Sequence, residues 1–341
     1  MADLSTLPPG RPLRGAAVGL RLLPFAVSGA CIWLLATRFD WSAVGGALMG
    51  AHWPLVVVAV GLVLAYLPVR AVRWRLMLGA TAPPFGTVLR VYAVSIAVAA
   101  AIPGSGEVVR AVALGRRGGV PTAYVLGTVA VEKGLDTALT LMLMLLGLWT
   151  AALRDEQVDH LLLGAALLTS AGLLAGIALL AALVRWLPPG AVWTPPQWVP
   201  PRLARLLARL VAVSLAAAER FGSGARAIWH LPRRRQAAIL ALTLVSWVAT
   251  WLLTLAALAA FGLAVQGALA AVLWGALALG LSVPSAPGGL GTFQLVVVTV
   301  LQAFDQPVAP SLAFAIGFHA LTAGPIFLAG AVASLRGRPR S

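Results

Sequence analysis

The sequence predicts an all-α polytopic membrane protein with six full transmembrane spans, two re-entrant helical hairpins and an inverted repeat. Hydrophobic residues fill 60% of the 341 positions and charged residues only 10%, and the mean hydropathy is +0.94. The apolar residues form runs long enough to cross a bilayer as helix, for which about 20 residues suffice. Two of the apolar segments are interrupted by Pro and Gly, and these interruptions predict the hairpins.

Eight hydrophobic segments follow from these runs. Six are expected to be full spans, near residues 18–37, 54–72, 121–152, 161–185, 237–262 and 309–333. The other two, 86–117 and 268–304, are broken at PGSGE and at PSAPGGLG. Their arms of about 12–16 residues reach only about 18–24 Å as helix, short of a hydrocarbon core of about 30 Å. This length favours re-entrant hairpins, although Pro and Gly also kink ordinary membrane helices.

The basic residues predict the orientation of the chain, because cytoplasmic joints carry the excess of Lys and Arg. This rule places the joint with Arg70, Arg73 and Arg75 in the cytoplasm, together with the loop 186–236, and it places the acidic loop 154–159 outside. Both termini are then cytoplasmic in a multi-pass protein of the cell membrane, and the first span is an uncleaved anchor. The two broken segments enter the membrane from opposite sides.

The order span, span, hairpin, span occurs twice. Residues 18–152 and 161–333 are therefore expected to form two inverted repeats within a single membrane domain, 1–341, a recurring plan among transporters. In the cytoplasmic Arg-rich loop 186–236, residues 201–221 place arginines on one helical face and leucines on another. This pattern predicts an amphipathic helix on the anionic inner leaflet. A plain connecting loop whose arginines enforce the topology is the alternative.

Composition also bears on several other classes of function. The net charge is +15, but the basic residues lie at joints between apolar runs, so we expect no nucleic-acid partner. Cys31 is the only cysteine and the four histidines are scattered, so we expect no intrachain disulfide, no metal site and no cofactor. We found no nucleophile elbow and no nucleotide-binding loop, so we do not expect an enzyme.

Charged residues in apolar segments mark the candidate site. Glu107 and Arg110 are spaced i, i+3, so they share a helical face and can pair. Glu132 and Asp136 are spaced i, i+4 near the middle of span 121–152, and Lys133 lies about 100° round that helix from Glu132. Charges at this depth usually face a cavity or a partner. The structural alternative is a buried network, Arg110 with Glu132 and Lys133 with Glu107, that only holds the hairpin to its neighbour.

The two breaks supply a second set of candidates. The returning helices are expected to begin near Gly106 and Gly289, where free N–H groups and a positive dipole end suit an anionic group such as a phosphate. Glycines at these breaks let the backbone approach a ligand closely. The complete set of candidate substrate-binding residues is Glu107, Arg110, Glu132, Lys133, Asp136, Gly104, Gly106, Gly288, Gly289, Gly291 and Gln294.

Four ordered motifs make the chain resemble the lysylphosphatidylglycerol synthase transmembrane region family, also called the flippase-like domain family. They are RAVRWRLML (70–78), PGSGEVVR (103–110), VEKGLD (131–136) and PSAPGGLGTFQ (284–294). The resemblance covers nearly the whole chain and implies a membrane region associated with moving aminoacylated or glycosylated lipids between leaflets. Gln294 stands where the family usually has an acid, which affects any proton coupling there. Lys133 stands where the family often has Arg.

We therefore expect a flippase-like protein that moves a polar-headed lipid, carrying a phosphate or a sugar, between leaflets. Its expected partners are membrane lipids and the anionic inner leaflet. An ion- or proton-coupled transporter of a small solute is one alternative, and a non-catalytic partner of a lipid-modifying enzyme is another. Because no soluble acyltransferase-like domain follows the last span, we do not expect this chain itself to aminoacylate lipids.

Overall fold

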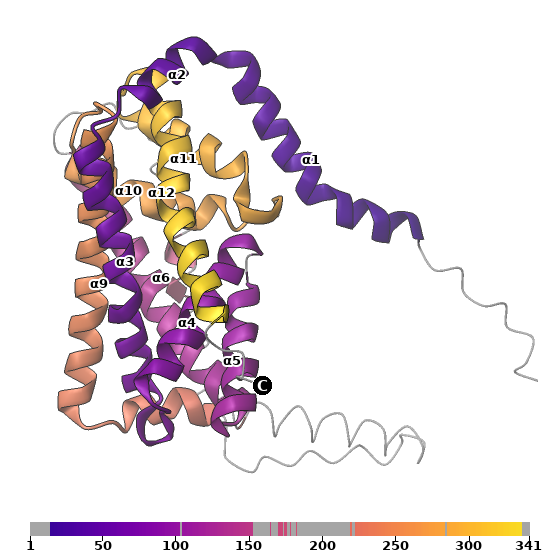
Figure 1. Cartoon of the computed structure of the whole chain (residues 1–341), viewed down its shortest axis with the longest axis vertical. Coiled ribbons are helices and arrows are strands. Elements are labelled where there is room, and N and C mark those ends of the chain that lie inside the picture. The colour runs from indigo at the N-terminus through magenta and orange to yellow at the C-terminus, as the bar shows by residue number, and fades with distance from the viewer. Residues whose placement is uncertain are drawn as a thin grey trace, which may run out of the picture.

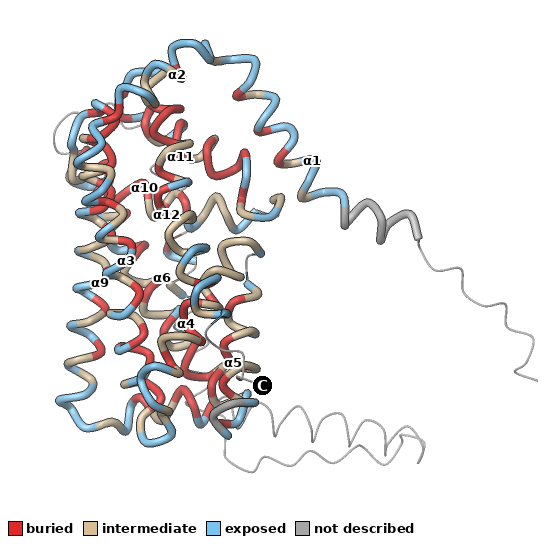
Figure 2. Tube along the Cα trace, viewed as in Figure 1, coloured by how far each residue is buried: buried red, intermediate tan, exposed pale blue. Residues whose placement is uncertain are grey.

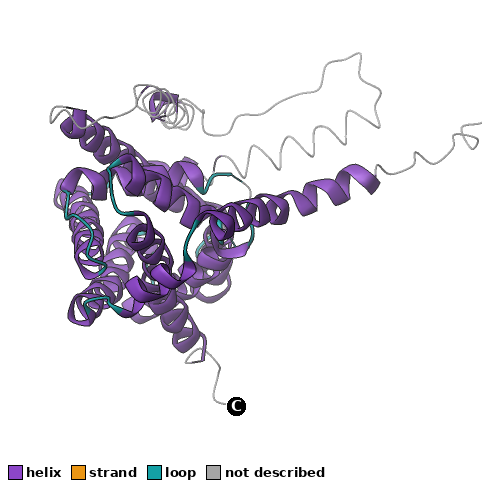
Figure 3. Cartoon of the chain, turned by 90° about the horizontal axis from the view of Figure 1, so that it is seen from above, coloured by secondary structure: helices purple, strands orange, loops and turns teal. Residues whose placement is uncertain are grey.

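The structure is a computed structural model that describes residues 14–102, 104–152, 222–283 and 285–335, with isolated positions between 164 and 219. The regular elements in these ranges are helices (Figure 3). They include α1 (Arg14–Arg38), α2 (Trp41–Met49), α3 (Trp53–Met77), η2 (Gly79–Thr81), α4 (Phe85–Ala101), α5 (Ser105–Gly118), α6 (Thr122–Ala152), α9 (Arg233–Ala260), α10 (Gly267–Gly280), η3 (Pro287–Gly289), α11 (Thr292–Ala303) and α12 (Val308–Leu335).

Four of the described helices are long and apolar enough to cross a membrane, namely α3, α6, α9 and α12. Helices α1 and α2 meet the same test only as a pair, and they are bent by 92° relative to each other. Asp40 lies at this bend and caps α2, since its carboxylate accepts the backbone N–H groups of Ser42 and Ala43. The six expected full spans are therefore not confirmed. The segments 161–185 and 201–221 fall outside the described ranges.

Both broken segments are interrupted where their Pro and Gly residues predict. Ile102 is extended because it precedes a proline, which disfavours helical backbone, and Gly104 then takes a left-handed conformation at the start of α5. In the second segment, Gly288 has a φ of 76° between α10 and α11. The four arms contain 17, 14, 14 and 12 residues. As helix, the longest of them spans about 25 Å.

The long helices form a bundle, and the short helices of the two broken segments pack in it at different heights (Figure 1). Helix α3 packs along α9, α6 packs against α10, and α12 packs against α4. In Figure 1, α4 and α5 lie in the lower part of the bundle, whereas α10 and α11 lie in its upper part. The breaks of the two segments therefore face each other in the middle of the bundle.

The outer surface of the bundle is apolar, as a lipid-facing surface requires. Helix α9 exposes Leu240, Leu244, Val248 and Leu252 at four-residue intervals, which places all four on one face. The opposite side of the helix is buried in the bundle (Figure 2). A soluble helical bundle would cover this outer surface with polar residues, so the apolar surface and the four long apolar helices show that the chain is a multi-pass membrane protein.

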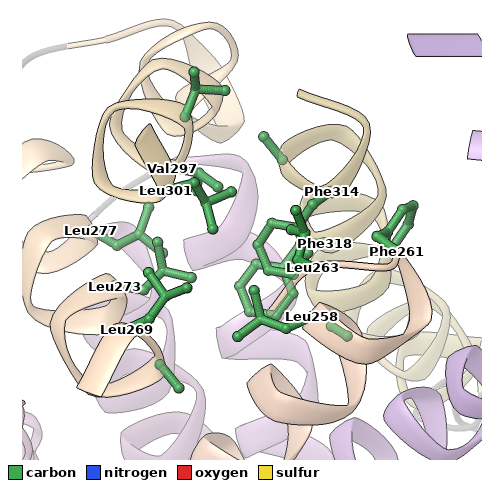
Figure 4. Close-up of a cluster of buried hydrophobic side chains, with 14 of the residues drawn as sticks. Leu258, Phe261, Leu263, Leu269, Leu273, Leu277, Val297, Leu301, Phe314 and Phe318 are labelled. Atoms are coloured by element: carbon green, nitrogen blue, oxygen red, sulfur yellow. The ribbon is translucent and has the colours of Figure 1, made fainter. Parts of the chain in front are cut away.

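An aromatic and aliphatic cluster holds the upper half of the bundle together (Figure 4). Phe314 and Phe318 of α12 stack with ring centres 4.9 Å apart, and Phe261 meets Phe314 edge to face at 5.9 Å. Leucines of α10 and α11, such as Leu273 and Leu301, fill the remaining space. This packing fixes α12 relative to the second broken segment.

Candidate functional site

A buried ion-pair network joins α3 to α6. Arg73 has no exposed surface, and its Nη1 and Nη2 atoms donate to the two carboxylate oxygens of Asp136 at 2.7 and 2.9 Å. The same Nη2 lies 3.0 Å from Glu132 Oε1, and Nη1 donates to Thr243 Oγ1 of α9 at 3.1 Å. Arg70, one helical turn earlier, lies 3.0 Å from Asp136 Oδ2. These bonds explain how α6 holds two carboxylates inside an apolar bundle.

Arg110 ties α5 into the same network. Its Nη1 donates to Glu132 Oε2. The guanidinium also lies over the rings of Tyr92 and Trp74, 4.5 and 4.9 Å from their centres. The Tyr92 hydroxyl donates to Glu132 Oε1 at 3.3 Å. Arg110 is only 2% exposed, so these groups enclose it completely and leave it no face for a ligand.

Glu107 and Lys133 form the outer pair of the network. Lys133 Nζ lies 2.7 Å from Glu107 Oε1, and the Lys133 side chain is 51% exposed. Glu107 and Arg110 could pair by their spacing, but α5 packs against α6 and each of these side chains forms its ion pair with an α6 residue. The arrangement that we considered as the structural alternative, with Arg110 on Glu132 and Lys133 on Glu107, is the one present.

Sequence analysis missed two members of this network. We placed Arg70 and Arg73 in the joint after a span that ends near residue 72, but α3 continues to Met77 and carries both side chains into the bundle. The signal was in the spacing. Arg70 and Arg73 are three residues apart and share one face of α3, as Glu132 and Asp136 share one face of α6.

The network carries one positive charge in excess. Its cations are Arg70, Arg73, Arg110 and Lys133, and its carboxylates are Glu107, Glu132 and Asp136. Of these cations, Arg70 lines a cavity. Its guanidinium lies 4.5 Å from the centre of the Tyr66 ring, and its Nη1 lies 3.0 Å from Asp136 Oδ2. One cation of this positively charged network therefore lies at the cavity wall.

This cavity has a volume of about 370 Å³ and lies where the two breaks approach each other. Ala99 and Ala100 at the end of α4 line one side, and Gly288 and Gly289 line another. Most of the wall is apolar, and its polar residues are Tyr66, Arg70, Trp247, Thr250, Trp274, His319 and Thr322. Trp247 Nε1 also lies 3.4 Å from Asp136 Oδ1, which links the cavity wall to the ion-pair network.

His319 and Gln294 form a neutral polar pair beside the cavity. Gln294 Oε1 accepts the N–H of Gly291 at 2.9 Å, which leaves its Nε2 facing His319 Nδ1, also at 2.9 Å. An amide nitrogen only donates, so His319 Nδ1 must be unprotonated and accept this bond. The imidazole stacks on Phe293 with ring centres 4.2 Å apart. The pair therefore ties α12 to the first turn of α11.

The candidate glycines serve different purposes. Gly288 and Gly289 line the cavity. Gly104 lies at the exposed turn before α5, and Gly291 packs against α1, where an added Cβ would lie 2.8 Å from Ser28 O. At Gly106 an added Cβ would lie 2.5 Å from Ser95 O of α4. The missing side chain at Gly106 thus permits close contact of two helices, and neither Gly104 nor Gly106 lines the cavity.

The described residues contain no group of three or more His, Cys, Asp or Glu side chains that could hold a metal ion. Comparison with known proteins gives one family model, described as "Lysylphosphatidylglycerol synthase TM region", which matches residues 21–330. No curated protein and no solved structure gives a match. The matched region contains the whole ion-pair network and the whole cavity, and we conclude that the chain belongs to the lysylphosphatidylglycerol synthase TM region family.

Proposed function

We propose that this protein moves a polar-headed lipid between the two leaflets, with the headgroup passing through the cavity between the two breaks. The observation that carries the proposal is that cavity, because it combines an apolar wall with a surplus cation inside a membrane bundle. Membership of a lysylphosphatidylglycerol synthase membrane-region family supports a role in handling lipids.

The volume of the cavity favours entry of the headgroup alone. At about 370 Å³ it lies near the lower end of sites for small molecules, which hold about 300–1,000 Å³. The two acyl chains would then stay in the surrounding bilayer while the headgroup crosses. A lipid handled in this way needs no fully enclosed tunnel for its chains.

The charge of the site favours a headgroup with one net negative charge, such as a phosphodiester. We assign its recognition to Arg70 in place of Arg110, because Arg110 is enclosed by Glu132, Tyr92 and Trp74. Arg70 lines the cavity, and Asp136 keeps its two-point contact with Arg73 when Arg70 turns to a ligand. A planar guanidinium is well suited to phosphate oxygens. Glu107, Glu132 and Lys133 then act by positioning the arginines.

We further propose that the broken segments are re-entrant hairpins in inverted repeats. The packing supports this, since α6, which follows the first segment, packs on α10, and α12, which follows the second, packs on α4. The partners α3 and α9 pack on each other. Exchanging the two halves of the chain turns the α6–α10 contact into the α12–α4 contact and leaves the α3–α9 contact unchanged. Discontinuous helices that meet at the site are typical of transporters with inverted repeats.

Transfer of fluorescent lipids in reconstituted vesicles tests the proposed function. Ala323→Phe adds a ring on the α12 face that lines the cavity and should abolish transfer. The matched control is Ala320→Phe, which adds the same ring to an exposed position of the same helix and should leave transfer unchanged. Equal transfer by both variants and the unchanged chain would overturn the proposed pathway. Uptake of small solutes by vesicles without any lipid transfer would favour a solute transporter.

A further inference from the structure

A second pocket lies on the first broken segment, on the side away from the ion-pair network. It is a groove of about 500 Å³ between α4, α5 and α12, lined mainly by valines and by two arginines, Arg90 and Arg116. We propose that this groove binds one anionic phospholipid, with the phosphate at the two arginines and an acyl chain along the valines. The site is separate from the transport cavity and shares no lining residue with it.

The groove has the polarity gradient of a phospholipid. Arg90 lies about 8 Å along the axis from the first residue of α4, and Arg116 lies about 3 Å from the last residue of α5. Val94 and Val109 lie about 13 Å from the same two ends. The two helices are antiparallel arms of one segment, so both arginines lie nearer its two outer ends than Val94 and Val109 do. Charge at the end and apolar surface below match a headgroup and its chain.

The part of the groove that α5 forms lies on one continuous face of that helix. On α5, Val108, Val112 and Arg116 follow at four-residue intervals, and Val108 is 57% exposed. The buried face of the same helix carries Arg110 and Leu114 toward the bundle. The groove therefore uses the face of α5 that the rest of the described chain leaves uncovered.

The charges of the groove favour an anion. Within the described residues, neither Arg90 nor Arg116 forms an ion pair with a carboxylate, whereas Arg70, Arg73 and Arg110 all do. Unpaired cations between membrane helices near the bilayer surface are the usual binding sites for anionic headgroups. A soluble phosphate would satisfy the arginines but would leave the valine surface bare, so the occupant we commit to is a lipid.

Lipid binding to the purified full chain tests this site. In detergent, we would titrate phosphatidylglycerol and phosphatidylcholine with identical oleoyl chains and count bound lipids by native mass spectrometry. We expect one phosphatidylglycerol to be retained in preference to phosphatidylcholine. Each arginine near an anionic headgroup contributes roughly fivefold in affinity. Arg90→Gln with Arg116→Gln should therefore weaken phosphatidylglycerol binding roughly 25-fold.

Two controls keep this test specific. Arg233→Gln with Arg234→Gln removes the same charge from exposed positions at the start of α9 and should leave binding unchanged. Val94→Trp fills the groove while both arginines remain, and it should displace the lipid, whereas Val245→Trp on the exposed face of α9 should not. Equal retention of the two lipids, or undiminished binding by the double arginine variant, would overturn the proposal. Competition by soluble glycerol phosphate at lipid-like affinity would also overturn it, in favour of a small-anion site.

Because this inference concerns binding and not transport, it does not depend on the proposed function. If the chain binds the lipid at Arg90 and Arg116 but transfers none, the proposed groove site stands and the proposed transport pathway fails. If the chain transfers lipid but binds none at these arginines, the transport pathway stands and the groove site fails.

Discussion

Arg73 and Asp136 meet at two points inside the bundle, with each carboxylate oxygen of Asp136 accepting one N–H of the Arg73 guanidinium at 2.7 and 2.9 Å. Two parallel bonds fix both the distance and the rotation of the partners. Arg73 belongs to α3 and Asp136 to α6, so this contact sets the register between two long helices. The remaining charges are arranged around it.

Removing a buried carboxylate should be far more costly than removing the outer one. Glu132→Gln leaves the buried Arg110 without its ion-pair partner, while Arg73 keeps Asp136, and breaking a buried pair in this way costs about 3–5 kcal/mol of unfolding free energy. Glu107→Gln affects only the pair with the half-exposed Lys133 and should cost less than about 1 kcal/mol. Unfolding of both variants in detergent measures the difference. Equal losses would mean that Glu132 is not buried as the structure places it.

Arg70→Gln should alter selectivity without unfolding the protein. Asp136 remains bonded to Arg73, so the bundle keeps its central contact while the cavity loses its surplus charge. A hydrogen bond to a charged group contributes about 1.5–3 kcal/mol, so transfer of phosphatidylglycerol relative to a neutral glycolipid should fall at least about tenfold.

The control for Arg70 is Arg75→Gln, an exposed position on the same helix whose Nε donates to Pro83 O. This variant should transfer phosphatidylglycerol and the neutral glycolipid in the same ratio as the unchanged chain does. If the unchanged chain transfers the neutral glycolipid faster than the phospholipid, then phosphate recognition at Arg70 is wrong and the substrate is a glycolipid.

Gln294→Glu should change the protonation of His319. In the unchanged chain the Gln294 amide donates to Nδ1, so nitrogen NMR of labelled histidine should show a neutral ring protonated only at Nε2 near pH 7. A glutamate keeps an oxygen for the Gly291 N–H and offers the ring a second oxygen that only accepts. We therefore expect the nitrogen signals of this variant to show a proton on Nδ1 of His319. Gln302→Glu, the same change at an exposed position of α11, should leave the His319 signal as it was.

Gly106→Ala should separate the two arms of the first broken segment. Its Cβ would lie 2.5 Å from Ser95 O and 2.7 Å from the Ala99 Cβ, which is closer than such atoms approach. Relief of this overlap requires a backbone shift and should cost about 1–3 kcal/mol. Gly86→Ala near the start of α4 meets no atom within 4 Å and should be neutral or slightly stabilising. Thermal unfolding of the two variants side by side would show a clear loss only for Gly106→Ala.

The proposed inverted orientation of the hairpins predicts which side of the membrane each loop faces. In a chain whose Cys31 is replaced by Ala, single cysteines at Arg116 and at Asp305 should react with an impermeant reagent from opposite sides. In the proposed topology, Arg116 follows the segment that enters from the cytoplasm, and Asp305 follows the segment that enters from outside. Labelling of both positions from one side would exclude inverted hairpins.

The sequence by itself determined the class of the protein, the places where the helices break and most of the charged residues inside the bundle, although not Arg70 and Arg73. These features are local. A helix forms where apolar residues run on, and it stops at Ile102 because a proline follows, whatever the rest of the chain does. The i, i+4 spacing of Glu132 and Asp136 likewise puts them on one face of α6 in any fold that keeps the helix.

Only the tertiary structure decided which charges pair and which face the cavity. Glu107 and Arg110 share a face of α5, yet both bond to α6, because an ion pair depends on the position and rotation of the opposing helix. The same reason explains why Arg70 and Arg73 belong to the network, why Gly106 serves helix packing, and why His319 meets Gln294 across 25 positions of sequence. Contacts between helices that are distant in sequence are fixed by how the helices pack, and the local residue spacing within one helix does not specify that packing.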